Sequence, residues 1–480
     1  MSDVGASGGG TPKAKRFRLP HAVAFLVIMV LIVIGMTWVL PAGQYERTTV
    51  TLPSGVKQVR VVSGTYHEVD PAPQAVWKVI PDLVKGFDQS ASMIFMVFFC
   101  GGAVYILEQT GTVRVFFQRL IKRVAGREHW AIFAVMFIMS MGGATGAFAN
   151  NVIALLPLGI LLARGMGFDN AVGFGMIYLG AYSGFNVGWA NVFTIGIAQG
   201  IAEIPELSGM FVRVIFHIVN FAMSYWLVAH YAAQVRKDPY ASLNYEEGMG
   251  LSEFMGEEKG GDVDEKSALR HIICGVITLL GFVGIVWGSA QWGWSIPEYS
   301  AIFLTIAILC GLFGGLGVSG TTVAFLKGCG SIVAGAFVIG IARAISIVMS
   351  DGKIIDTVVY HLSQPISHYG PVVGASLMFY ANALINFFIP SGSGQAVAVM
   401  PLMVPLADIS GITRQVAVQA FQFGDGFSNC IVPTSGVLMS VLAMSGIPYG
   451  KYVKWFAPFL LLQIILASIA LTVLQMYGWS

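Results

Sequence analysis

The chain has 480 residues, of which 56% are hydrophobic and only 11% are charged, and its net charge is +2. Soluble domains carry about 25% charged residues, so this composition excludes an ordinary water-soluble protein and predicts a protein embedded in a membrane. The small net charge does not favour nucleic-acid binding. The five cysteines lack CxxC spacing, which indicates neither a disulfide framework nor a zinc site.

The chain begins with a polar segment, 1–19, which we predict to be a cytoplasmic tail. No small-residue cleavage site clearly follows the next apolar run, 20–40, so we expect a retained membrane helix there and not a signal peptide. Residues 42–75 alternate Thr and Val and predict a small extracellular β-ribbon. Further membrane helices are expected at 91–109, 171–200, 207–234, 269–290, 296–316, 330–349, 413–445 and 453–477.

Two other apolar blocks, 129–164 and 371–408, each break at a small polar tip. Each half-block has about 15 to 20 residues, which is short for a full span of about 20. We therefore expect two re-entrant helical hairpins. Two ordinary spans in each block are the alternative.

The hairpins belong to two similar stretches, Gly142–Pro205 and Pro390–Pro448, which match at an offset of 244 residues. Pro157 matches Pro401, and a one-residue slip brings Ile204 onto Ile447. This similarity predicts two membrane repeats, 20–235 and 269–480, joined by a cytoplasmic linker at 236–268. A weaker echo relates 103–113 to 344–354, with the amphipathic stretches 113–124 and 353–365 expected to lie along the interface.

The positive-inside rule orients this layout. With the N-terminus in the cytoplasm, 18 of the 27 Lys and Arg residues lie inside, eight lie outside and Arg343 remains within the bilayer. The C-terminus is then extracellular or periplasmic. The first hairpin enters from inside and the second from outside, so the repeats are inverted.

The hairpin tips are the first candidate site. Irregular backbone survives in a bilayer only where it lines a protein-enclosed cavity, and interrupted segments in two halves indicate a transporter's binding site. Helix N-termini at the tips would suit a carboxylate. The candidate substrate-binding residues of the tips are Asn150, Asn151, Ser391, Gly392, Ser393, Gly394 and Gln395. Simple capping of a tight turn is the alternative.

The second candidate site lies in the breaks of the long helices 171–200 and 413–445. Carbonyl groups freed at such breaks commonly bind a coupling cation. We expect a sodium site from Asn186, Asn191, Thr194, Ser428 and Ser435, and substrate contacts from Asp425, Asn429 and Thr434. Asp425 could complete a cation cage, bind a substrate amine or carry a coupled proton.

Arg343 lies in the middle of an apolar helix. A charge there costs at least about 2.5 kcal/mol, so an intramembrane arginine is a functional candidate, here for a substrate carboxylate. A structural partner, Asp425 or a helix carbonyl, is the alternative. The sequence contains no HExxH, GxSxG, Walker or dinucleotide motif, so we predict no enzyme and no cofactor beyond a coupling Na+ or H+.

Four stretches resemble the YfcC branch of the dicarboxylate and arginine/ornithine carriers, within the ion-transporter superfamily. They are GMTWVLPAGQYER, IGIARAISIVMSDGKIIDT, NFFIPSGSGQAVAVMPLMVPLAD and RQVAVQAFQFGDGFSNCIVPTSGVLMSVLAMSGIPYGKYVKW. The resemblance implies an all-α polytopic protein with inverted repeats, two re-entrant hairpins, a scaffold domain that dimerises and a transport domain that moves as an elevator. Dicarboxylate carriers of the superfamily carry a Ser-Asn-Thr signature at both tips, whereas this chain has Ala149-Asn150-Asn151 and Ser391-Gly392-Ser393.

These observations predict a secondary transporter of the cell (inner) membrane for a small carboxylated metabolite, in the first place an amino acid. Coupling to Na+ or H+ and exchange of solutes all remain open. The alternatives are a dicarboxylate or organic-anion symporter, a passive channel and a ligand sensor. The expected partners are the solute, the lipid bilayer and a second copy of the chain.

Overall fold

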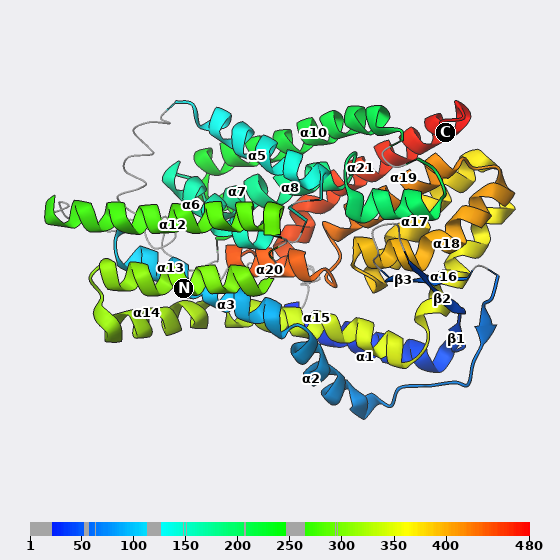
Figure 1. The fold of residues 1–480 in the computed structure, drawn as a ribbon, viewed down its shortest axis with the longest axis horizontal. Helices are drawn as coiled ribbons and strands as arrows, with labels where there is room; N and C mark the ends of the chain where they lie inside the picture. Colours follow the sequence, from blue (N-terminus) through cyan, green and yellow to red (C-terminus); the bar gives the residue numbers. More distant parts are fainter. Residues whose placement is uncertain are drawn as a thin grey trace, which may run out of the picture.

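The structure is a computed structural model that describes residues 22–51, 57–62, 64–112, 126–146, 148–149, 151–205, 208–245, 265–292, 294 and 296–480. It is mostly helical (Figure 1). Within these residues six helices are long and apolar enough to cross a membrane, or seven if α14 and α15, which meet at a bend of 47°, are counted together. The chain is therefore a polytopic membrane protein.

One group of helices lies along the lower and left side of Figure 1. In it α3 packs against α13 and α14, α12 packs against α13, and α15 packs against α1 and α2. Its members are α1 (Ala22–Val39), α2 (Val79–Gln89), α3 (Ala91–Gln109), α12 (Glu265–Trp292), α13 (Ile296–Phe313), α14 (Gly317–Ser331) and α15 (Val333–Asp351), with the short 3₁₀ helix η1 (Val76–Lys78) before α2. We call this group the outer helices.

The second group contains the two helix pairs that we predicted to be hairpins, together with the two broken helices. Its first-half members are α5 (Glu128–Ala144), α6 (Val152–Gly165), α7 (Asn170–Phe174), the π-helix η2 (Gly175–Leu179), α8 (Gly180–Phe185), the π-helix η3 (Val192–Gly196), α9 (Ile197–Ile201), α10 (Met210–Lys237) and the 3₁₀ helix η4 (Pro239–Ala241). Its second-half members are α16 (Ile355–Ser363), the 3₁₀ helix η5 (Gln364–His368), α17 (Pro371–Phe388), α18 (Gly392–Ser410), α19 (Arg414–Asn429), α20 (Gly436–Ser445) and α21 (Tyr449–Met476). We call this group the inner helices.

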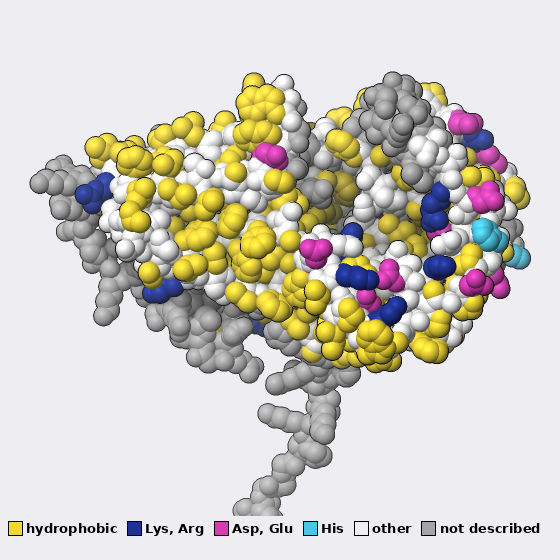
Figure 2. Space-filling view, turned by 60° about the horizontal axis from the view of Figure 1, so that its bottom comes forward, with side chains coloured by type: hydrophobic (Ala, Val, Ile, Leu, Met, Phe, Trp, Pro, Cys, Tyr) yellow, Lys and Arg dark blue, Asp and Glu magenta, His cyan; other side chains and the backbone are white. Residues whose placement is uncertain are grey.

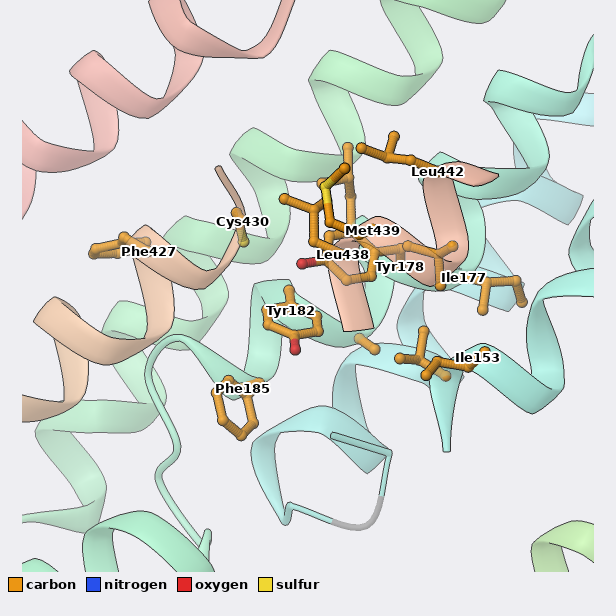
Figure 3. Packing of buried hydrophobic residues seen from close by; sticks show 14 of the residues in the cluster. Ile153, Ile177, Tyr178, Tyr182, Phe185, Phe427, Cys430, Leu438, Met439 and Leu442 are labelled. Carbon is orange, nitrogen blue, oxygen red and sulfur yellow. The ribbon is translucent and has the colours of Figure 1, made fainter. Parts of the chain in front are cut away.

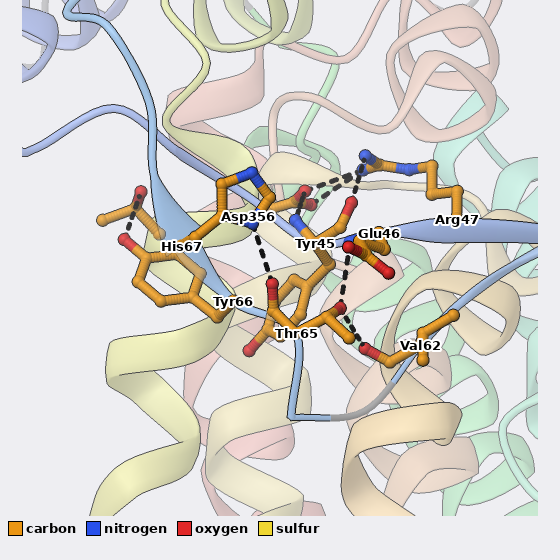
Figure 4. Close-up of polar contacts among 9 residues, drawn as sticks. Tyr45, Glu46, Arg47, Val62, Thr65, Tyr66, His67 and Asp356 are labelled. Carbon is orange, nitrogen blue, oxygen red and sulfur yellow. Dashed lines mark hydrogen bonds and ion pairs between the residues drawn. The ribbon is translucent and has the colours of Figure 1, made fainter.

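The predicted β-ribbon is present and packs on the inner helices. Strand β2 (Arg47–Thr51) pairs with β3 (Lys57–Val61), and β1 (Gly43–Gln44) pairs with β4 (His67–Glu68), both antiparallel. The Asp356 carboxylate in α16 accepts two hydrogen bonds from Arg47 Nη2, at 2.8 and 2.9 Å, and one from the backbone N–H of Tyr45 at 3.0 Å (Figure 4). These bonds tie the ribbon to α16, the helix that leads into the second hairpin.

The surface has the character of a membrane protein. Figure 2 shows apolar side chains over much of the visible face, while charged side chains gather at the right-hand end, where Figure 1 places the strands and α16. On α12, Leu279, Leu280 and Trp287 are each about 60% exposed. Apolar exposure on this scale is typical of contact with lipid.

The helix predictions succeed with three differences. The expected helix 91–109 is α3, and both long helices break as expected, at 186–191 and 430–435. The sequence analysis missed α14 before the expected helix 330–349, and it missed α2. The estimate that the hairpin halves are short was wrong for the second hairpin, because α17 and α18 have 18 and 19 residues and are each long enough to cross a membrane. The arms of the first hairpin, α5 and α6, have 17 and 14 residues.

Positions that match at the offset of 244 share local structure. Asp169 and Thr413 cap α7 and α19 by accepting hydrogen bonds from Val172 N and Val416 N. Just before these caps, Gly167 and Gly411 have φ values of +80° and +70°. Both helix ends use the left-handed conformation that glycine adopts at little cost.

Some predicted features lie outside the described residues. They are the tail 1–19, the stretch 113–124, most of the linker and Asn150.

Candidate functional site

The tip of the second hairpin touches both broken helices. We call α17, α18 and the tip residues 389–395 hairpin 2, and the segments 186–191 and 430–435 break 1 and break 2. A Cβ on Gly392 would stand 2.6 Å from Thr194 Cγ2, just after break 1, and 2.8 Å from Asp425 Oδ2, just before break 2. A residue with a Cβ at this position would have to push aside the side chain of Thr194 or of Asp425. The sequence-predicted residues Gly392, Thr194 and Asp425 therefore meet at one point.

Asp425 is fully buried in the last turn of α19. Its Oδ1 accepts a hydrogen bond from Asn429 Nδ2 at 2.9 Å, whereas its Oδ2 has no hydrogen-bond partner within the described residues. An ionised carboxylate buried in a membrane protein is stable only with a partner. The free oxygen is the one that faces Gly392.

Several other buried side-chain atoms in these segments also lack a partner among the described residues. The acceptors are Asn386 Oδ1 and Gln395 Oε1, the donor is Asn191 Nδ2, and Thr194 Oγ1 can serve as either. Buried polar groups in native proteins are almost always hydrogen-bonded, so a group of unpaired atoms requires an explanation. Here the unpaired atoms are mostly oxygens and include one carboxylate, which suits a positively charged ligand group.

The two broken helices cross at their breaks. A Cβ on Gly426 would lie 2.5 Å from the Cα of Asn186. Beside this contact the side chains of Asn186 and Cys430 meet, with Nδ2 and Sγ 3.7 Å apart. Figure 3 shows Tyr178, Tyr182 and Phe185 from the first half next to Phe427 and Cys430 from the second. The crossing thus joins the two halves of the chain directly.

Several carbonyl groups at the breaks, which we expected to be cation ligands, are hydrogen-bonded in the structure. Each of these accepts a hydrogen bond from a side chain. The pairs, donor first, are Gln422 to Phe185 O, Tyr178 to Asn429 O, Tyr452 to Cys430 O, Tyr449 to Ile431 O and Asn220 to Ser183 O. The first two of these bonds join the two halves, and the other three lie within one half.

The predicted sodium ligands do not form one unpaired group. Asn191 Nδ2 and Thr194 Oγ1 are unpaired among the described residues, and Thr194 lies against Gly392. Ser428 Oγ accepts from Asn386 Nδ2 at 2.8 Å and donates to Gly424 O, while Ser435 caps α20 by accepting from Leu438 N. Asn186 faces Cys430. Three of the five residues thus have structural contacts of their own.

The remaining residues of hairpin 2 divide into exposed and buried positions. Ser391, which caps α18 by accepting from Gly394 N at 3.3 Å, is exposed, as are Ser393 and Gly394. Gln395 is buried and donates to the carbonyl of Asn382 at 2.9 Å. Thr434 of break 2 donates to Phe387 O at 2.7 Å, which attaches the break to the end of α17.

The tip of the first hairpin lies against break 1. A Cβ on Gly146, whose φ is +81°, would stand 2.5 Å from Asn191 Oδ1. The N–H of Ala190 donates to the carbonyl of Ala144 at 3.2 Å. Asn151 is half-buried and directly precedes α6, whereas Asn150 is not described. The first tip therefore contacts break 1 and the second contacts Thr194 just after it, and in each contact a glycine allows the close approach.

Arg343 lies on α15, one of the outer helices, and is exposed. Its Nε donates to Gln89 Oε1 of α2 at 3.0 Å, so the alternative that pairs Arg343 with Asp425 was wrong. One turn along, Ser346 Oγ donates to the carbonyl of Phe388, the last residue of α17, at 3.2 Å. The face of α15 that carries Arg343 therefore adjoins the tip of hairpin 2.

The sequence analysis missed Asn382 and Asn386 in α17. Asn386 donates to the Asp425 carbonyl at 3.2 Å and to Ser428, and a Cβ on Gly424 would lie 2.5 Å from Asn382 Cβ. Their spacing of four residues, which places two amides on one face of an apolar helix, is the signal that could have found them. No group of three or more His, Cys, Asp or Glu residues that could hold a metal occurs in the described chain.

Comparisons with known proteins assign the chain to a family of carriers. The chain is 28% identical over 501 residues to YfcC of Escherichia coli strain K12, provisionally named a basic amino acid antiporter, and the match covers 97% of this chain and 98% of the relative. It is 26% identical to an uncharacterized protein of Haemophilus influenzae, with 96% and 98% covered.

Two solved structures are also similar to the chain. One is the YdaH transporter of Alcanivorax borkumensis, with 17% identity, 96% of this chain and 99% of that chain covered, and a TM-score of 0.39. The other is MtrF of Neisseria gonorrhoeae, which is described as illuminating a class of antimetabolite efflux pumps, with 15% identity, 95% of each chain covered and a TM-score of 0.39.

The family model described as C4-dicarboxylate anaerobic carrier matches residues 19–476, nearly the whole chain. This agrees with the family resemblance found in the sequence motifs, and the family model indicates a membrane transporter. The chain belongs to the C4-dicarboxylate anaerobic carrier family, in which YfcC is a relative along its full length.

Proposed function

We propose that the protein is a secondary active transporter for a small carboxylated metabolite that bears a positive charge, in the first place an amino acid. The observation that carries this proposal is the free Oδ2 of buried Asp425, which lies with Thr194 against Gly392 at the tip of hairpin 2. An ammonium or guanidinium group bound there would neutralise the carboxylate and supply donors to the neighbouring oxygens.

The substrate carboxylate would bind on the other side of the hairpin 2 tip. Arg343 uses only its Nε in a hydrogen bond of the described structure, and its helix contacts hairpin 2 through Ser346 and Phe388. Together with the exposed N-terminus of α18, Arg343 can bind an anionic group. The exposed Ser391 and Ser393 add polar contacts, and Asn429 holds Asp425 in place.

The architecture we propose is a pair of inverted repeats that move by an elevator mechanism. The caps Asp169 and Thr413, the left-handed glycines and the Asn186–Cys430 contact all relate positions 244 residues apart, which supports the repeats. The division into outer and inner helices supports a scaffold and a mobile part. If the Asp425 carboxylate moves across the membrane with the mobile part, its charge must be neutralised by a bound cation, a proton or a cationic solute. This requirement supports coupling to Na+ or H+, or exchange of one solute for another.

We also propose the setting of this transporter. It would lie in the cell (inner) membrane with its N-terminus in the cytoplasm, and two copies would associate through the outer helices. The distribution of Lys and Arg supports this orientation.

The second candidate is a dicarboxylate or organic-anion symporter, which the family model favours. In that case Asp425 and Thr194 would bind the coupling cation, and Arg343 would bind the anionic solute. The two candidates therefore assign different partners to Asp425.

Thermal unfolding of the purified protein with amino acids and with C4 dicarboxylates, each with and without sodium, separates these candidates. We expect arginine or lysine to raise the unfolding temperature without sodium. Stabilisation by succinate that needs sodium would establish the second candidate instead. Uptake of the stabilising compound into proteoliposomes would then separate transport from binding, and conduction without saturation would indicate a channel.

A further inference from the structure

Two hydrogen bonds at the helix crossing are related to each other by the offset of 244 residues. The Tyr178 hydroxyl donates to the carbonyl of Asn429 at 3.1 Å, and Gln422 Nε2 donates to the carbonyl of Phe185 at 2.6 Å. Tyr178 matches Gln422, and Phe185 matches Asn429, at that offset. Each half thus makes the same kind of bond to the other half.

The acceptors of these bonds occupy equivalent places. Phe185 ends α8 and Asn429 ends α19, so both carbonyls belong to the last turn of a helix that breaks in the next residue. Carbonyls in the last turn of a helix receive no hydrogen bond from their own helix. Without the Tyr178 and Gln422 donors, these two carbonyls would be buried and unpaired. Tyr178 and Gln422 are both fully buried, so water cannot replace them as donors.

Each of the two hydrogen bonds holds a segment that carries or adjoins a residue of the proposed site. Asn429, whose carbonyl is held by Tyr178, donates through its side chain to Asp425 Oδ1 and so leaves Oδ2 toward Gly392. On the other side, a Cβ on Gly188 would lie 2.9 Å from Gln422 Nε2, which places this amide against the loop that leads to Asn191. The two bonds therefore fix the two breaks, which adjoin Thr194 and Asp425.

We propose that Tyr178 and Gln422 are a matched pair of positioning residues for transport. Tyr178 sets the orientation of Asp425 through Asn429, and Gln422 sets the position of break 1 with Asn191 and Thr194. Neither residue touches the substrate. The inference rests on the proposed function for its effect on transport, whereas its effect on the crossing can be measured without any substrate.

A cross-linking experiment tests the positioning in the full-length protein. Cys430 is retained, the other four cysteines are replaced by Ala, and Asn186→Cys is introduced. Because the Asn186 side chain contacts Cys430 Sγ, the parent should form the disulfide rapidly with copper phenanthroline. Formation of the disulfide is measured after denaturation, as the loss of the two thiols that react with a maleimide reagent.

Two substitutions are then added to this parent, one in each half. Tyr178→Phe removes one hydroxyl, and Gln422→Met keeps the length of the side chain while removing the amide. We expect cross-linking to slow about fivefold in each, the change that one lost buried hydrogen bond makes in an equilibrium constant. Tyr231→Phe is the matched control, because the buried Tyr231 hydroxyl bonds Asp169 far from the crossing, and it should leave the rate unchanged.

Transport of a probe provides the second readout, with arginine counterflow as the assay. Tyr178→Phe should raise the half-saturation concentration for arginine about fivefold and change the maximal rate less, since it misorients a binding group. If arginine is not transported by the protein that retains Asn186, the proposed function fails, but the cross-linking result still stands on its own. Parent-like cross-linking in both variants, or no cross-link in the parent, would overturn the positioning role. A lower unfolding temperature in the variants with unchanged cross-linking would also overturn it.

Discussion

Asn429 donates to Oδ1 of Asp425 at 2.9 Å from one turn further along α19, and this bond leaves the second carboxylate oxygen facing the tip of hairpin 2. A buried acid held in this way has one oxygen fixed and one available for a ligand. Because Gly392 and Thr194 come from two other segments, a cation bound at the free oxygen would hold the hairpin against both halves of the protein.

Gly392→Ala should abolish transport while leaving the protein folded. The added methyl group would stand 2.6 Å from Thr194 and 2.8 Å from Asp425 Oδ2, and would thus occupy the space of a ligand at that oxygen. Counterflow in proteoliposomes should fall about tenfold or more, as for other small displacements of a binding site. Gly370→Ala is the control, because a Cβ there meets nothing within 4 Å. Equal transport by Gly392→Ala and the control would contradict the assigned site.

Gly426→Ala should destabilise the protein. Its Cβ would meet the Cα of Asn186 at 2.5 Å, and backbone cannot move aside as a flexible side chain can. Overpacking of this kind costs about 1–3 kcal/mol. Thermal unfolding in detergent should show a lower midpoint than for the parent, while Gly200→Ala, with no neighbour within 4 Å, should not. An unchanged midpoint for Gly426→Ala would mean that the helices do not cross here.

Arg343→Gln should weaken binding of arginine more than binding of agmatine, which lacks the carboxylate. The guanidinium of Arg343 is exposed beside hairpin 2, where a substrate carboxylate can reach it. Loss of a charge-assisted hydrogen bond should reduce arginine affinity about tenfold. Isothermal titration calorimetry measures the affinity for both compounds. An equal loss of affinity for arginine and agmatine would show that Arg343 does not bind the substrate carboxylate.

Asp356→Asn should loosen the β-ribbon without unfolding the membrane helices. The carboxylate accepts from Arg47 and from the Tyr45 backbone, and an amide can accept only part of this set. The expected loss is about 1–2 kcal/mol, seen as faster hydrogen exchange of the backbone amides in β2. Arg47→Ala should give the same exchange pattern, and adding it to Asp356→Asn should have little further effect. Additive effects would show that the two residues act independently.

The sequence predicted the fold where composition alone sets the structure. Helix α3 and the two helix breaks were expected where they occur, because long apolar runs and polar interruptions leave few choices in lipid. Helix α14 was missed since its fifteen residues include four glycines, and α2 was missed since it is short and amphipathic. Both are stabilised by neighbours that are distant in the sequence, α3 for α14 and α15 for α2.

The candidate site was predicted only in outline. Polar tips and breaks marked the residue types, and Gly392, Thr194 and Asp425 do meet. Which polar atoms remain unpaired could not be predicted, because the partners of Ser428 and Thr434 come from another element, α17. The pairing of Arg343 with Gln89 was likewise hidden, since α2 itself was not foreseen.

Arginine counterflow in proteoliposomes, compared between the parent and Asp425→Asn, tests the central proposal most directly. The substitution keeps the size of the side chain and removes the negative charge that a cationic substrate needs. The exposed Asp70→Asn is the control. We predict saturable exchange of arginine by the parent and by the control, and a loss of about tenfold or more in Asp425→Asn. Exchange by Asp425→Asn at the parent's rate, or a parent that exchanges succinate but not arginine, would contradict the proposal.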